Sequence, residues 1–214
     1  MTLWFEADLY DVLQLVQVLD RLPDDGPIRL VLVGQDEFRG VSGVSPEELA
    51  ALGRGAPPVT GEQHGLARSA WAAFTAPDPA GLGELVPATP ALPAIGQALH
   101  RLLQEYPSTG NGLSRTERQL LEAVGAGART REAGFRAASV AEERPFLGDA
   151  TAWTVLDRLA PLLDGEGLSE RGRAVLAGRE SWSSEEERWI GGVRLPPGRY
   201  PWRWDPDAQT LVQG

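Results

Sequence analysis

The chain has 214 residues, 42% of them hydrophobic, which suffices for one large domain or two small ones. It contains no cysteine, which excludes disulfides, thiol catalysis and cysteine-based zinc sites. All 20 basic residues are arginines, which excludes lysine chemistry such as Schiff-base formation. His64 and His100 are the two histidines, too few for a multi-histidine metal centre, so we predict no metal site of that kind.

The net charge of −10 is unevenly distributed. Residues 1–112 carry 6 arginines against 14 carboxylates, which gives −8, and residues 113–214 carry 14 against 16, which gives −2. An acidic front half repels nucleic-acid phosphate, so charge disfavours nucleic-acid binding and confines it to the back half. No apolar stretch reaches the roughly 18 residues of a membrane span, and no basic region precedes the first apolar run. We therefore expect a cytoplasmic, bacterial-type protein without a signal peptide or membrane segment.

The chain begins with a pattern typical of a strand–helix–strand unit. Leu3–Glu6 is an apolar strand, and Leu9–Leu22 has the periodicity of an amphipathic helix. After a break at Pro23–Pro27, the β-branched run Ile28–Val33 predicts a second, buried strand. A crossover of this length predicts that the two strands pair in parallel.

Three carboxylates, Glu6, Asp8 and Asp11, follow the first strand directly, at the edge where open α/β sheets bind ligands. As catalytic residues they would bind a divalent metal or act as general acid and base, helped by Asp36 from the end of the second strand and by His64. A purely structural interpretation competes with this one. Asp8 is a good N-cap, and Asp11 stands where a capping-box partner stands, whereas Glu6 has no such role.

Helices dominate the rest of the front half. Capping boxes at Ser45/Glu48 and Thr60/Gln63 predict two helices, and Thr89–Tyr106 predicts a longer one. The front half therefore starts as a small parallel sheet with helices and holds too few strands for a self-sufficient sheet. A polar, glycine-containing run at 107–112 predicts a boundary between an N-terminal region, 1–110, and a second domain, 111–214.

The back half has the order of a winged helix. A capping box at Ser114/Glu117 opens the first of three helices, and a short hairpin at Pro161–Leu168 precedes a closing helical turn. In that fold the third helix reads the major groove. Here the third helix, Ala150–Leu159, carries Arg158 as its single basic residue, which argues against a groove-reading role.

The tail is rich in tryptophan. Trp189–Leu195 predicts a strand with a glycine pair, and Tyr200–Asp205 with Thr210–Val212 predicts a terminal β hairpin. Tryptophan with interleaved arginine can stack nucleic-acid bases, yet alternation on a hairpin would equally bury Trp202 and Trp204 together. The candidate ligand or partner surface comprises Trp4, Tyr10, Asp36, His64, Arg115, Arg118, Trp189, Trp202, Arg203 and Trp204.

Several motifs together resemble one bacterial family, known as domain of unknown function 1835. They are Trp4-Phe5-Glu6-x-Asp8-Leu9-Tyr10-Asp11, Asn111–Glu117, Phe146–Asp149, Trp189–Val193 and Trp202–Asp205. The resemblance covers nearly the whole chain and implies the family's fold, but no activity. Relatives commonly have residues before the first strand, so it implies a shortened member, a misassigned start or a partner that completes the sheet. Relatives often have histidine where this chain has Ala7, so a Glu–His–Asp cluster would be incomplete here.

Three functions follow from these observations. The first is a non-catalytic regulatory or protein-interaction module, with a protein partner or self-association. The second is a hydrolase or transferase that acts on a phosphorylated or nucleotide-like small molecule through Glu6, Asp8 and Asp11, with a divalent metal as its cofactor. The third is a winged-helix DNA-binding regulator that places Arg115 and Arg118 on phosphates.

Overall fold

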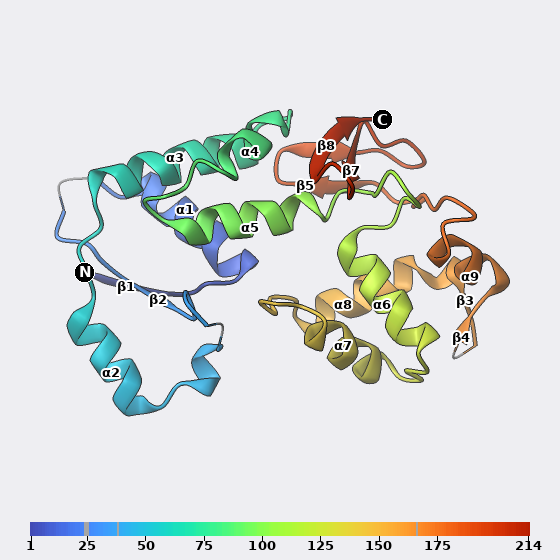
Figure 1. Ribbon diagram of the computed structural model, residues 1–214, viewed down its shortest axis with the longest axis horizontal. Helices are drawn as coiled ribbons and strands as arrows, with labels where there is room; N and C mark the ends of the chain where they lie inside the picture. Colours follow the sequence, from blue (N-terminus) through green and yellow to red (C-terminus); the bar gives the residue numbers. More distant parts are fainter. Residues whose placement is uncertain (24–25, 38, 166) are drawn as a thin grey trace. The chain divides into compact units, whose positions relative to one another are not determined.

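The computed structural model describes residues 1–23, 26–37, 39–165 and 167–214; residues 24, 25, 38 and 166, which fall in expected turns and loops, lie outside that description. The described residues form helices and short two-stranded sheets, so the fold is mixed α/β (Figure 1). The chain divides into two compact units, Met1–Arg101 and Leu102–Gly214. Within the described ranges, no helix is long and apolar enough to cross a membrane.

The first unit is built on a parallel pair of strands. β1 (Thr2–Glu6) leads into α1 (Leu9–Arg21), which returns the chain to β2 (Arg29–Val33). The strands pair in register from Thr2 opposite Arg29 to Glu6 opposite Val33. The predicted parallel pairing is therefore confirmed.

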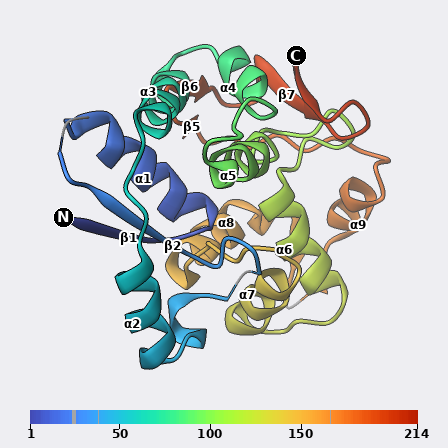
Figure 2. The ribbon, with the colours of Figure 1, turned by 60° about the vertical axis from the view of Figure 1, so that its left-hand side comes forward.

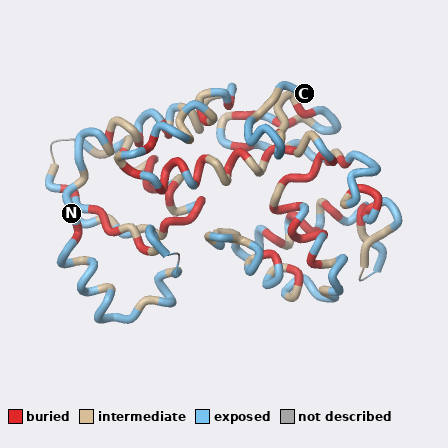
Figure 3. The backbone as a smooth tube through the Cα atoms, in the orientation of Figure 1, coloured by how far each residue is buried: buried red, intermediate tan, exposed pale blue. Residues whose placement is uncertain are grey.

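Helices cover both faces of this pair. α1 and α3 (Gly61–Thr75) pack together on one face, and α2 (Pro46–Gly55) lies on the other (Figures 1 and 2). α1 buries Leu15 and Leu19 completely, whereas α2 has no buried residue and is mostly exposed (Figure 3). The unit also contains the 3₁₀ turn η1 (Val41–Gly43) and α4 (Ala80–Leu85).

The helix expected at Thr89–Tyr106 is shorter in the structure. α5 extends over Pro93–Leu103. Pro90 and Pro93 lack the N–H that a helix interior requires, so the residues before Pro93 form a turn in which the Leu92 N–H donates to the Thr89 carbonyl. Proline at the first helical position is favourable, and α5 accordingly begins at Pro93.

The second unit packs its helices around one apolar core. Its elements in order are α6 (Arg115–Gly125), α7 (Arg131–Val140), α8 (Asp149–Arg158), η2 (Ala160–Leu162), β3 (Leu163–Asp164), β4 (Gly167–Leu168) and α9 (Glu170–Leu176). Leu120, Leu121, Leu159 and Leu162 are fully buried in the core. β3 and β4 pair antiparallel, which confirms the short hairpin.

The tail contains two hairpins. Trp189–Leu195 was expected to be one strand, and this prediction was wrong. β5 (Arg188–Ile190) turns back on β6 (Val193–Leu195), because Gly191 adopts a φ of 56° that favours a turn. β7 (Trp202–Asp205) and β8 (Thr210–Gln213) form the predicted terminal hairpin.

A buried carboxylate, Glu117, joins several of these elements. Only 1% of its surface is exposed, and it closes the capping box of α6 by accepting from the Ser114 N–H at 2.9 Å. Its other oxygen accepts from Arg188 on β5 at 2.6 Å and lies 3.8 Å from Arg158 Nε on α8. Burial and the nearby Arg188 charge lower the pKa of Arg158. Glu117 therefore supplies the negative charge that lets two arginines lie inside the unit.

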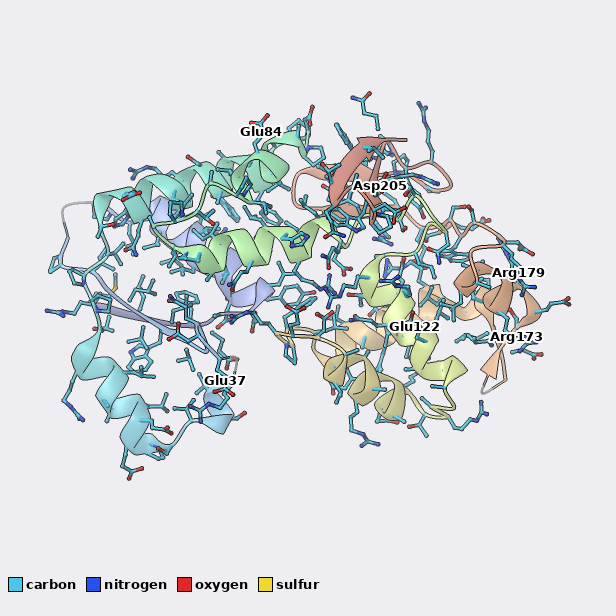
Figure 4. All side chains as sticks on the ribbon, in the orientation of Figure 1. Glu37, Glu84, Glu122, Arg173, Arg179 and Asp205 are labelled. Carbon is cyan, nitrogen blue, oxygen red and sulfur yellow. The ribbon has the colours of Figure 1, made fainter. Side chains whose placement is uncertain are left out.

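We expect Glu117→Gln to lower the free energy of unfolding by about 3–5 kcal/mol, because it leaves two enclosed cations without their counter-ion. Glu122→Gln on the same helix is the matched control (Figure 4). Glu122 is exposed and 3.9 Å from Arg118, so its loss should cost less than about 0.5 kcal/mol. Urea unfolding followed by tryptophan fluorescence measures both, and equal effects would contradict the role given to Glu117.

Candidate functional site

The three carboxylates after β1 are each engaged by a backbone N–H group. Asp8 Oδ1 accepts from the Asp11 N–H at 2.9 Å, and Asp11 Oδ2 accepts from the Glu6 N–H at 2.7 Å. Glu6 Oε1 accepts from the Val41 N–H at 2.9 Å. Asp8 is thus the N-cap of α1, as predicted, but Asp11 reaches back to Glu6 rather than to Asp8. Glu6, which had no predicted structural role, fixes the loop that follows β2.

These hydrogen bonds give the three carboxylates a structural role in the turn between β1 and α1. Within the described residues, no three His, Asp or Glu side chains are grouped so that they hold a metal ion, and Glu6, Asp8 and Asp11 line none of the cavities described below. His64 is not brought to them: it is 1% exposed in α3, and its Nδ1 lies 3.2 Å from the Leu19 carbonyl oxygen. At these three residues the structure shows a hydrogen-bonded strand-to-helix turn.

The ionised form of Asp8 is destabilised by burial and by neighbouring negative charges. It is 7% exposed, and burial is the main reason that its pKa is raised above the ordinary 3.8, followed by the neighbouring Asp11 and Glu6 charges. The hydrogen bond from the Asp11 N–H opposes this rise. Asp8 therefore carries its negative charge at a cost that the N-cap bond offsets only in part.

The first unit contains a groove of about 770 Å³ along the outer edge of β2. It lies between β2, α2 and the two prolines that follow α2, and most of its lining surface is apolar. Residues that line it include Leu32, Ala51, Leu52, Gly55, Pro57 and Leu92. A volume of this size is in the range of about 300–1,000 Å³ that is usual for ligand sites.

The groove borders a strand edge that is only partly paired. Arg29 donates to the Met1 carbonyl and Val33 accepts from the Ala7 N–H, so the alternate residues Arg29, Val31 and Val33 form the ladder with β1. The backbone groups of Leu30 and Leu32 point to the opposite edge. The Leu30 N–H donates to the Pro57 carbonyl at 3.1 Å, and no described backbone group bonds to Leu32 on that side.

The mouth of the groove is acidic. Asp36 and Glu37, from the loop after β2, line it together with Glu48 of α2 (Figure 4 labels Glu37). Bonds from the Ser45 backbone and hydroxyl lower the pKa of Glu48, so this carboxylate stays ionised. Arg39 lies 3.9 Å from Glu48 in an exposed pair. Three carboxylates against one arginine favour a positively charged ligand.

The second unit has a smaller cavity of about 250 Å³ with a mostly polar lining. It brings together three residues that the sequence had selected, Arg115, Arg118 and Trp204. Four further polar residues were not selected as site residues, because no local pattern shows that the fold brings them to one cavity. These residues are Gln104, Ser108, Asn111 and Gln209.

The remaining predicted surface residues are dispersed. Trp4 is 44% exposed and lies over Gly53 of α2, where a Cβ atom would be 2.9 Å from the indole ring. Tyr10 and Trp189 are also exposed, and the Trp189 indole donates to Glu187. Trp204 is buried and Trp202 is half-buried on the terminal hairpin.

Arg203, also half-buried, is not among the residues that line the described cavities, and neither is Trp202.

Comparison of the chain with protein-family models, curated proteins and solved structures finds no match. Function must therefore be inferred from the geometry of the two cavities and of the carboxylates.

We expect Asp8→Asn to become increasingly more stable than the wild type as the pH rises from about 3.8 towards 7. A raised folded-state pKa means that the folded protein holds the Asp8 proton longer than the unfolded chain, so rising pH removes wild-type stability at this position. Asparagine keeps the N-cap and has no charge. The free energy of unfolding of both proteins, from urea titrations across this pH range, measures the difference.

Asp8→Ala provides the control for the cap itself. Relative to Asp8→Asn, which also lacks the charge, it loses the bond to the Asp11 N–H and should be about 1 kcal/mol less stable at neutral pH. A gap between Asp8→Asn and wild type that stayed constant or narrowed with rising pH would contradict the electrostatic argument.

Proposed function

We propose that this protein is a non-catalytic interaction module that binds an extended peptide segment of a partner protein along the free edge of β2. The observation that carries the proposal is that, among the residues that the structure describes, no backbone group bonds to Leu32 on this side or to the Leu30 carbonyl, at the wall of an apolar groove. A peptide strand placed there would pair with these groups, which is the common mode of strand addition to a sheet edge.

The chain's own residues show how this edge accepts a strand. The Val59 N–H donates to the Ile28 carbonyl, and Arg29 forms an antiparallel bridge with Pro58. The ladder stops at Pro57, because proline has no N–H to offer the Leu30 carbonyl. Two residues before Pro57, Gly55 belongs to α2 and therefore cannot pair with Leu32. An added peptide would continue a ladder that the chain itself begins.

The groove favours a peptide that combines apolar and basic residues. Alternate side chains of the peptide would face Leu52, which is 42% exposed, and the small Ala51 on α2. A basic residue at the other end would lie near Asp36 and Glu37. The same acidic mouth opposes self-association through this edge, because a second copy would bring like charges together.

The other two functions receive less support. The enzyme interpretation needs carboxylates that face a cavity, whereas Glu6, Asp8 and Asp11 accept backbone N–H groups. Binding to DNA needs cations on the third helix, whereas α8 exposes Asp149 and Asp157, and its Arg158 lies beside buried Glu117.

The proposal also includes the fold of the second unit and the relation of the chain to a protein family. The order α6, α7, α8, β3–β4 and α9 supports a winged-helix-like arrangement, and we propose that it serves packing. The relation to family 1835 rests on the sequence motifs alone and is also part of the proposal.

The test uses a fluorescent ten-residue peptide of alternating valine and threonine with two arginines at one end. Fluorescence anisotropy with the full chain should show saturable binding, and exchange of the arginines for glutamates should weaken it at least about tenfold. Ala51→Trp, which fills the groove, should also weaken binding about tenfold. Ala50→Trp, the neighbouring exposed alanine outside the groove lining, is the matched control and should bind like the wild type.

Peptides N-methylated at alternate residues separate strand pairing from simple hydrophobic contact. In one peptide the methyl groups replace the amide hydrogens that face β2, and this peptide should not bind. In the other peptide the methyl groups are on the amides that face away from β2, and binding should be preserved. Hydrogen exchange of the Leu32 amide should slow when the peptide binds. No binding, equal sensitivity of both methylation phases, or concentration-dependent dimerisation that Ala51→Trp abolishes would overturn the proposal.

A further inference from the structure

The small polar cavity of the second unit has the features of an anion site. Arg115 and Arg118 both line it, three residues apart on α6, so that they lie on the same side of the helix. Ser108, Gln104 and Gln209 add neutral polar groups, and the described lining contains no carboxylate residue. The Asn111 amide also lines the cavity, but it already donates to the Val175 carbonyl and accepts from the Leu113 N–H. Two cations without an acidic residue in the wall distinguish this cavity from the acidic groove beside β2.

The start of α6 does not itself supply the binding groups. The Arg115 N–H donates to the Gln104 carbonyl, the Thr116 N–H to Glu105 and the Glu117 N–H to the Ser114 hydroxyl. These bonds occupy the first-turn N–H groups that would otherwise attract an anion. Any anion in this cavity must therefore be held by side chains.

The guanidinium groups of Arg115 and Arg118 differ in how firmly neighbouring residues hold them. Arg115 is fixed, because one of its terminal nitrogens donates to Gln104 Oε1 at 2.7 Å and the other lies 3.5 Å from Glu142. Its remaining N–H groups are available to a ligand, since a guanidinium has five. Arg118 is half exposed, and its pair with Glu122 at 3.9 Å is weak, so this side chain can turn towards a ligand at small cost.

The opposite wall is held in an unusual conformation. Gln209, in the turn between β7 and β8, has a φ of 52°, which is uncommon for a residue other than glycine. Its side-chain amide donates to the Pro206 carbonyl at 2.6 Å, and both residues line the cavity. Ser108 accepts from the Gly110 N–H, which leaves its own hydroxyl proton for a ligand.

We infer that this cavity binds a small phosphate monoester. Glu142 and Glu122 already lie beside the two arginines, so a phosphate must attract them more strongly than these carboxylates do, and its oxygens suit the planar donor groups of guanidinium. The volume equals the share of roughly eight water molecules, which admits a phosphate with a short carbon chain but not a drug-sized ligand. The inference concerns a different unit from the peptide groove and does not depend on it.

The test measures binding of glycerol phosphate to the full chain by isothermal titration calorimetry, with inorganic phosphate and acetate as comparison ligands. Glycerol phosphate should bind more tightly than acetate, and its affinity should fall as salt is added. Arg118→Gln should weaken binding at least about tenfold. Arg136→Gln, an exposed arginine on α7 outside the cavity lining, is the matched control and should have no effect.

A second variant protects the test against an indirect effect on folding. Ser108→Ala removes one neutral donor and should weaken glycerol phosphate binding while the melting temperature stays within about 2 °C of wild type, as expected for a surface change of a few tenths of a kcal/mol. Absence of binding, equal binding of acetate, or equal loss in Arg118→Gln and Arg136→Gln would overturn the inference.

Discussion

The second unit depends on one buried negative charge. Glu117 completes the cap of α6 through the Ser114 N–H and holds Arg188 of β5 at 2.6 Å. Arg188 also donates to the Glu105 carbonyl, and the Glu105 side chain in turn accepts from Thr116. A helix start, a strand and the segment before α6 are thereby fixed to one another. The walls of the polar cavity come from this framework, because Arg115 and Gln104 are neighbours of the groups that Glu117 and Glu105 hold.

Local signals in the sequence were sufficient to predict a structural feature where the hydrogen-bond partner of a residue lies only a few positions away in the chain. The capping boxes at Ser45, Thr60 and Ser114 form as expected, since each needs only a glutamate or glutamine three residues later. The parallel pair β1–β2 followed from periodicity and crossover length. The glycine pair at 191–192 was misinterpreted, because an apolar run interrupted by glycine fits a bulged strand and a tight hairpin equally well.

The candidate sites depend on contacts that no local pattern contains. The Glu6 carboxylate meets the Val41 N–H, 35 residues further along the chain, so its structural role could not be predicted from the strand-to-helix turn. The Leu30 carbonyl receives no bond from the neighbouring segment, because Pro57, 27 residues after Leu30, returns beside it without an N–H. Arg115, Arg118 and Trp204 were selected for separate reasons, and only the fold places them around one cavity with Gln209.

The two cavities differ in a way that assigns them different ligands. The groove beside β2 borders main-chain groups of Leu32 to which no described backbone group bonds, and it has apolar walls and carboxylates in its lining, a combination that fits a basic extended chain and repels phosphate. The cavity beside α6 has arginines and neutral polar groups, which attract an anion and exclude a strand by its size. The two proposals therefore give each cavity a charge that disfavours the ligand of the other. Under the two proposals, the groove would therefore take a basic extended peptide and the polar cavity a small anion.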